Sequence, residues 1–213
     1  MIFLSLIQEP FLLVVWVVAI FIILTVHEFA HALAATWQGD MTAKNEGRLT
    51  LNPFAHISWV GFMALLLVGF GWGRPVPFNP YNLRNQRYGQ AIVAVAGPLA
   101  NFLLAIIGII CLKLLFNFTG ISDNNLLFQF LNLIISLNII LMLFNLLPFP
   151  PLDGSKILFT FLSGVKYDRI REVLETQGTY VLFFIIILDN FSGLNFLSHF
   201  YKFILNGVYS LFF

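Results

Sequence analysis

Charged residues and cysteine are both scarce in this sequence. Only 10% of the 213 residues are charged, whereas 59% are hydrophobic. A soluble domain carries about 25% charged residues, so this chain has too little polar surface to cover a water-soluble globule. A net charge of +1 excludes the basic field that a nucleic-acid partner requires. The single cysteine, Cys111, excludes a disulfide framework and a multi-cysteine metal cluster.

Long apolar runs make up most of the sequence instead. A helical span needs roughly 20 mostly apolar residues. The runs therefore predict an all-α, multi-pass helical bundle, embedded in the lipid bilayer of the cell membrane as a single domain, residues 1–213. The last run is interrupted at Asp189-Asn190, so it is either a hairpin of two segments or one span followed by an interfacial helix. The runs are Phe11 to Trp37, Ile57 to Trp72, Tyr88 to Phe118, Leu126 to Leu147 and Gly178 to Phe213.

The first apolar run contains an H-E-x-x-H pattern, with histidines at His27 and His31 and an acid at Glu28. Four helical residues turn through about 400°, so both imidazoles leave the helix on one face, at the spacing that binds one zinc ion. Glu28 lies about 100° further round, where its carboxylate reaches a water beside the metal. Ionisable groups are costly inside a span and mark functional sites there. The pattern predicts metal-assisted hydrolysis; the alternative is hydrogen bonding between helices.

A catalytic zinc site usually has three protein ligands and an open position, so a third ligand must come from elsewhere. The candidates are His56, His199 and Asp153. Asp153 closes an apolar segment that prolines interrupt, and a broken backbone at membrane depth is tolerated only where protein or a water-filled cavity compensates. We therefore favour Asp153 over His56; the alternative for this segment is a helix stop with a solvated acid.

Three sequence runs also carry a resemblance to a known family. They are H-E-F-A-H at 27–31, A-G-P-L-A-N at 96–101 and N-L-L-P-F-P-P-L-D-G at 145–154. In this order and spacing they closely resemble the site-2 protease family of intramembrane zinc metallopeptidases. The L-N-P run at 51–53 and the stretch 73–80 resemble its compact bacterial branch, which lacks a PDZ domain. A motif-bearing core at about 11–164 is expected from this resemblance, whereas the tract 178–213 carries no family motif.

The resemblance implies a role for each of five residues. His27, His31 and Asp153 would bind one zinc ion per chain, and Glu28 would be the general base. Asn145 would position the substrate or polarise its carbonyl group. The implied substrate is a protein that spans the membrane.

A parity argument constrains the topology. If His31 and Asp153 share one ion, both lie near the same face of the bilayer, yet three apolar runs separate them. The run 57–72 is the shortest and contains several glycines, so we predict that it is re-entrant or interfacial. The connection 73–87 carries three arginines and no acid, which places it and the active site on the cytoplasmic side.

Two further features have open interpretations. Gly97 and Asn101 fall level with the predicted metal, where small residues let helices approach closely, and either packing or catalysis would explain them. The polar segment 41–51 has possible strand character at 48–51. It would pair with an extended substrate by strand addition, or it is an ordinary interfacial loop.

The predicted function is a zinc endopeptidase that cuts peptide bonds within or next to transmembrane helices of its substrates. The alternative is a non-proteolytic membrane metalloprotein, either a metal carrier or an inactive relative that holds substrates. A structural scaffold without stoichiometric metal is the third class. Glu28 favours the enzyme, because a transport site needs ligands but no general base.

Overall fold

The computed structural model describes residues 9–68, 71–120, 125–162, 164–193 and 196–212. Within these ranges the chain is helical, and one isolated antiparallel bridge, between Ile57 and Gly73, is its only β pairing. The α-helices are α2 (Pro10–Trp37), α3 (Thr42–Asn45), α4 (Trp59–Val68), α5 (Gly89–Thr119), α6 (Leu126–Asn145), α7 (Asp153–Phe161), α8 (Asp168–Ser192) and α9 (Phe196–Phe212). Short 3-10 turns lie at Pro53–Ala55, Pro80–Asn82 and Val165–Tyr167.

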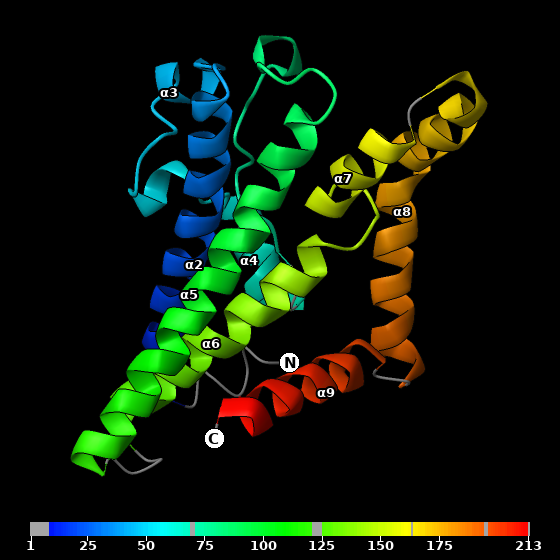
Figure 1. The fold of residues 1–213 in the computed structure, drawn as a ribbon. Coiled ribbons are helices and arrows are strands. Elements are labelled where there is room, and N and C mark those ends of the chain that lie inside the picture. Colours follow the sequence, from blue (N-terminus) through cyan, green and yellow to red (C-terminus); the bar gives the residue numbers. More distant parts are fainter. Residues whose placement is uncertain (1–8, 69–70, 121–124, 163, 194–195, 213) are drawn as a thin grey trace.

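Helices α2, α5 and α6 form the centre of the molecule. Among the described residues they are the three helices long and apolar enough to cross a membrane, with hydropathies of 2.3 to 2.6. Figure 1 shows them side by side, with α5 in contact with both of the others. The chain is therefore an integral membrane protein, as its composition predicts.

Local sequence sets the ends of these helices. Pro10 occupies the first turn of α2, where its missing N–H costs nothing. Gly120 ends α5 in the left-handed conformation at φ 58°, which glycine adopts without strain. The Asn125 side chain caps α6 by accepting from the Leu127 N–H at 2.9 Å.

The segment between α2 and α5 turns back on itself. Helix α4 is only 10 residues long, and the bridge from Ile57 to Gly73 joins the two ends of the segment. A Cβ on Gly61 would lie 2.1 Å from the Trp72 carbonyl oxygen, and one on Gly71 would lie 2.2 Å from that of Gly61. These two glycines let the returning chain touch α4. The described part of the segment therefore folds back on itself, the arrangement for which the parity argument asks, and its place in the membrane stays a prediction.

The predicted break after the third spanning helix is present. Helix α6 ends at Asn145, a turn containing the prolines follows, and α7 begins at Asp153. Helix α7 packs against α5, which brings its first residue towards the centre of the molecule.

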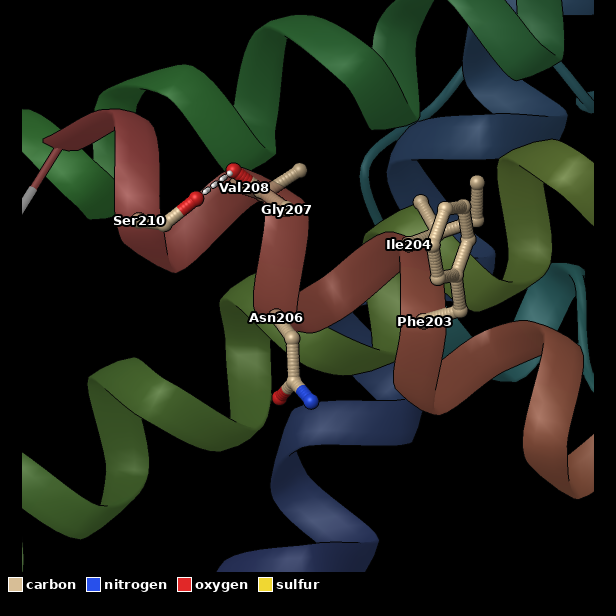
Figure 2. A pocket seen from close by; sticks show the side chains of 6 residues that line it. All are labelled: Phe203, Ile204, Asn206, Gly207, Val208 and Ser210. Carbon is tan, nitrogen blue, oxygen red and sulfur yellow. Dashed lines mark hydrogen bonds between the residues drawn. The ribbon is translucent and has the colours of Figure 1, made fainter.

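Two helices, α8 and α9, make up the described part of the C-terminal tract, and neither is among the candidate spans. In Figure 1, α8 stands to the right of the three central helices, and α9 runs back from its lower end towards α6, which it contacts. The Tyr209 hydroxyl on α9 donates to Asn132 on α6 at 2.8 Å. Figure 2 shows a hollow on α9, lined by Phe203, Ile204, Asn206, Gly207, Val208 and Ser210. All six come from one helix, and none is a predicted site residue.

Candidate metal centre

The three predicted metal ligands lie together in the structure. The His27 and His31 Nε2 atoms are 3.0 Å apart. The Asp153 Oδ2 atom lies 3.3 Å from His27 Nε2 and 3.1 Å from His31 Nε2. All three residues are buried. Two ligands come from one face of α2 and the third from the first residue of α7.

These distances fit a shared zinc ion. Four ligands held tetrahedrally at about 2.0 to 2.1 Å from zinc lie roughly 3.3 Å from one another, close to the three separations here. The His31 Nδ1 atom is 2.7 Å from the Val93 carbonyl oxygen, to which it donates, so the Nε2 of a neutral imidazole presents a lone pair. That lone pair faces the Asp153 carboxylate and the His27 ring. A divalent cation would satisfy all three groups.

Glycine and lysine neighbours hold Asp153 in place. A Cβ on Gly154 would lie 2.3 Å from the Leu146 carbonyl oxygen and 2.4 Å from that of Leu147, so only glycine lets α7 start against the preceding turn. The Lys156 ammonium is 3.4 Å from Asp153 Oδ1. Because Lys156 faces Oδ1, the other oxygen remains directed at the imidazoles. Lys156 follows Asp153 by three residues, a spacing that can be read from the sequence. Nothing else in the sequence marks Lys156 as a partner of Asp153.

Glu28 lies outside this group of three and has a different partner. Its Oε2 accepts a hydrogen bond from the Val76 N–H at 3.1 Å. A Cβ on Gly73 would lie 3.4 Å from Oε1 of the same carboxylate. The segment 73–76 therefore runs past the predicted general base.

Buried Arg48 and His56 hold that segment in place. Arg48 is 4% exposed, and its guanidinium donates to the Arg74 carbonyl at 2.6 Å and to the Pro75 carbonyl at 3.2 Å. Burial lowers the pKa of Arg48, and the charge of the Glu28 carboxylate opposes that shift. The backbone carbonyl of His56 accepts a hydrogen bond from the Arg74 N–H at 2.7 Å. The His56 side chain is placed by its Nε2, which lies 2.8 Å from the Thr50 carbonyl oxygen.

The structure places two features whose interpretation the sequence left open. Residues 48–51 form an irregular loop without strand pairing between described residues, and pairing of this loop with an extended substrate stays a prediction. His56 belongs to this loop network and lies outside the group of three predicted ligands. His199 is also outside it, on α9.

Gly97 lies directly against the two imidazoles. A Cβ at this position would lie 2.4 Å from His31 Nε2 and 2.6 Å from His27 Cε1. Asn145 is the last residue of α6, and its amide donates to the Leu141 carbonyl at 3.0 Å. No hydrogen bond between described residues joins Asn145 to the three predicted ligands.

Sequence reasoning missed Asp40, which links the loops at the metal end of α2. Asp40 is fully buried and accepts hydrogen bonds from the Thr42 N–H and hydroxyl, the Asn79 N–H and the Asn82 amide. Burial raises the pKa of Asp40, but these hydrogen bonds outweigh it and hold the pKa below the usual value of 3.8. An acid two residues after a glutamine gives no sequence signal for such a junction.

Comparison with known proteins now decides the family. Peptidase family M50 matches residues 15–124 and 115–188, which include both histidines and Asp153. This chain belongs to peptidase family M50. That assignment agrees with the resemblance found in the sequence, and the M50 chain is a zinc metalloprotease with membrane helices.

Individual relatives support the M50 assignment. The chain is 41% identical over 182 residues to YwhC of Bacillus subtilis (strain 168), covering 81% of this chain and 79% of YwhC. It is 27% identical over 171 residues to Rip2 of Mycobacterium tuberculosis (strain H37Rv), covering 78% of this chain and 62% of Rip2. Both relatives carry the name "putative zinc metalloprotease". No solved structure matches the chain.

Proposed function

We propose that this M50 peptidase is an intramembrane endopeptidase that hydrolyses peptide bonds in or next to transmembrane helices of membrane proteins. The position of the metal ligands carries the proposal. His27 and His31 lie inside the spanning helix α2, 6 to 10 residues before its end at Trp37, or about 9 to 15 Å along the helix. A peptide bond must therefore reach a site that is surrounded by spanning helices.

Each of the five residues has a role in this proposal. His27, His31 and Asp153 would hold zinc, which when bound lowers the pKa of a coordinated water and polarises a carbonyl group. Glu28 takes the proton of the attacking water and passes it to the leaving amine. The Val76 N–H fixes one oxygen of Glu28 and leaves the other to carry that proton. The Asn145 amide positions the substrate or polarises its carbonyl.

The substrate is proposed to enter as an unwound transmembrane segment. Within a helix each carbonyl group is hydrogen-bonded to an N–H four residues further on, which hides it from attack. A spanning helix must lose those bonds before a general base and a metal can act on its backbone. A site near one end of α2 suits this, because water and helix ends are both within reach there.

The proposed topology puts the active site on the cytoplasmic side. The connection 73–87, which passes Glu28, carries three arginines and no acid. With α4 re-entrant or interfacial, the ends of α2 and α6 reach the same face. The chain would then form one membrane-embedded peptidase domain over residues 1–213.

The second candidate function is a metal carrier or an inactive relative that holds substrates. Such a protein would need the three ligands but would have no use for a carboxylate beside them. Glu28 sits one residue from a ligand and accepts a backbone hydrogen bond that fixes its orientation. This placement favours the hydrolase.

The test compares Glu28→Gln, Asp153→Ala and the wild-type protein, purified in detergent, for bound zinc and for cleavage of a model transmembrane substrate. We expect one zinc per chain in the wild type and in Glu28→Gln. Cleavage by Glu28→Gln should fall by about 10²- to 10⁴-fold, and Asp153→Ala should lose zinc. Exposed Glu9→Gln is the matched control and should cleave normally.

Each alternative predicts a different result. Equal cleavage by the wild type and Glu28→Gln would remove Glu28 as the general base. Stoichiometric zinc without cleavage in the wild type would favour the carrier or substrate-holding function. If Asp153→Ala bound as much zinc as the wild type, a residue other than Asp153 would be the third ligand.

A further inference from the structure

Asn101 is a buried amide without a partner. Its residue is 0% exposed, and neither its Nδ2 nor its Oδ1 atom makes a hydrogen bond. Buried polar groups in folded proteins almost always have partners, so each exception calls for a physical explanation. Nothing in the proposed reaction so far uses this residue.

A second unpartnered atom belongs to a predicted metal ligand. The His27 Nδ1 atom is buried and makes no hydrogen bond. His31 differs, because its Nδ1 donates to the Val93 carbonyl at 2.7 Å. Metal-binding histidines almost always donate the second ring N–H to an acceptor, which fixes the tautomer and the ring orientation. The second ring nitrogen of His31 thus has an acceptor, whereas that of His27 has none.

Helix register places Asn101 near His27. Gly97, one turn before Asn101 on α5, lies against the His27 and His31 rings. Leu104, almost one turn after Asn101, packs against a cluster that contains Ile23, one turn before His27 on α2. The two helices therefore run antiparallel, and Asn101 lies between these two contacts, within about one helical turn of His27.

We propose that Asn101 is a positioning residue for the metal ligand His27. The amide oxygen of Asn101 accepts the Nδ1 proton of His27, either after rotation of the amide or through one buried water. This bond keeps the proton on Nδ1 and presents the Nε2 lone pair to Asp153 and the metal. The inference rests on the proposed metal centre. It adds an acceptor for the Nδ1 proton of His27, as the Val93 carbonyl provides for His31.

The first test is Asn101→Leu, which keeps the volume and removes the amide. We expect zinc affinity to fall by about 10- to 100-fold, measured by competition with a chelator on purified protein. The melting temperature of the zinc-free protein should not fall, because an unpaired buried amide is replaced by an apolar group. Loss of zinc affinity without loss of stability is a result that a packing role would not produce.

Two further variants complete the test. Asn101→Asp keeps an acceptor oxygen in the same place and should retain most of the zinc affinity. Asn138→Leu is the matched control, since Asn138 is a 0% exposed amide on α6 whose Oδ1 also lacks a partner. It should leave zinc affinity within about twofold of the wild type. In zinc-loaded wild type, the ¹⁵N resonance of His27 Nδ1 should show a protonated, hydrogen-bonded nitrogen.

The outcomes separate this inference from the proposed function. Equal zinc affinity in Asn101→Leu and the wild type would overturn the inference while leaving the metal centre intact. Equal loss in the Leu and Asp variants would also overturn it. If the Leu variant does not fold, Asn101→Ser should bind zinc more tightly than Asn101→Ala, and equal binding would overturn the inference. A wild type without stoichiometric zinc would remove the proposed function itself, and this inference with it.

Discussion

The backbone N–H of Val76 donates to the Glu28 carboxylate at 3.1 Å, across 48 residues of sequence. The segment that carries Val76 is held from its other side by Arg48, which binds the carbonyls of Arg74 and Pro75. The orientation of the proposed general base therefore depends on a buried guanidinium that lies outside every family motif recognised in the sequence.

Replacing Arg48 by lysine should slow the reaction without removing zinc. A lysine ammonium keeps the charge but lacks the planar fork that binds two carbonyls at once. Segment 73–76 would then shift relative to Glu28, and we expect kcat to fall by at least about 10-fold. Bound zinc and cleavage rates measured together check this, with exposed Arg84→Lys as control. Loss of zinc from Arg48→Lys would instead indicate a general folding role.

Gly97→Ala should abolish zinc binding, because its Cβ would lie 2.4 Å from the His31 Nε2 atom that faces the metal position. Zinc content after purification measures the effect. Gly108→Ala is a matched control on the same helix, since its Cβ would crowd Ile135 at 2.8 Å, away from the imidazoles. The control should lose stability by about 1 to 3 kcal/mol and keep its zinc. Full zinc occupancy in Gly97→Ala would contradict the geometry.

The sequence predicted the parts of this site that follow from local periodicity. The spacing of His27 and His31 on one helix face needs only helical geometry. Asp153 required more, because its approach depends on α5, α6 and a returning segment that local pattern does not place. The parity argument predicts that step, and the close approach of the chain at Gly61 and Gly71 favours it.

Contacts between loops could not be predicted in this way. Arg48, Asp40 and Lys156 act through backbone carbonyls, N–H groups or single ion pairs that have no sequence period. Segment 48–51 alternates like a strand, yet burial of the Arg48 guanidinium against Pro75 decides its path. In the chain without substrate, tertiary hydrogen bonding thus sets the conformation of a segment for which local propensity leaves both a strand and a loop open.

Asp40 makes the stability of the protein depend on pH in a specific direction. Its pKa is lower in the folded chain than the ordinary value of 3.8. Its contribution is therefore complete above the unfolded pKa, about 3.9, and is lost as the pH falls through the folded value. Asp40→Asn should destabilise the protein at pH 7 by about 1 to 3 kcal/mol, with a smaller difference below about pH 4. Melting temperatures across pH, with exposed Glu46→Gln as control, check this; a difference independent of pH would contradict it.

Gly178→Ala tests whether α8 supports the turn that carries Asp153. Alanine in an exposed helix interior stabilises by about 0.8 to 1 kcal/mol relative to glycine, so propensity alone predicts a gain. At Gly178 a Cβ would lie 2.6 Å from the Pro150 ring, and this overlap should reverse the sign to a loss of about 1 to 3 kcal/mol. Gly207→Ala on α9, where nothing lies within 4 Å, should show the gain. Thermal unfolding of both variants decides the point. If both variants were stabilised by the same amount, α8 would not be packed tightly against this turn. The position of Asp153 would then depend on α5 and α6 and not on α8.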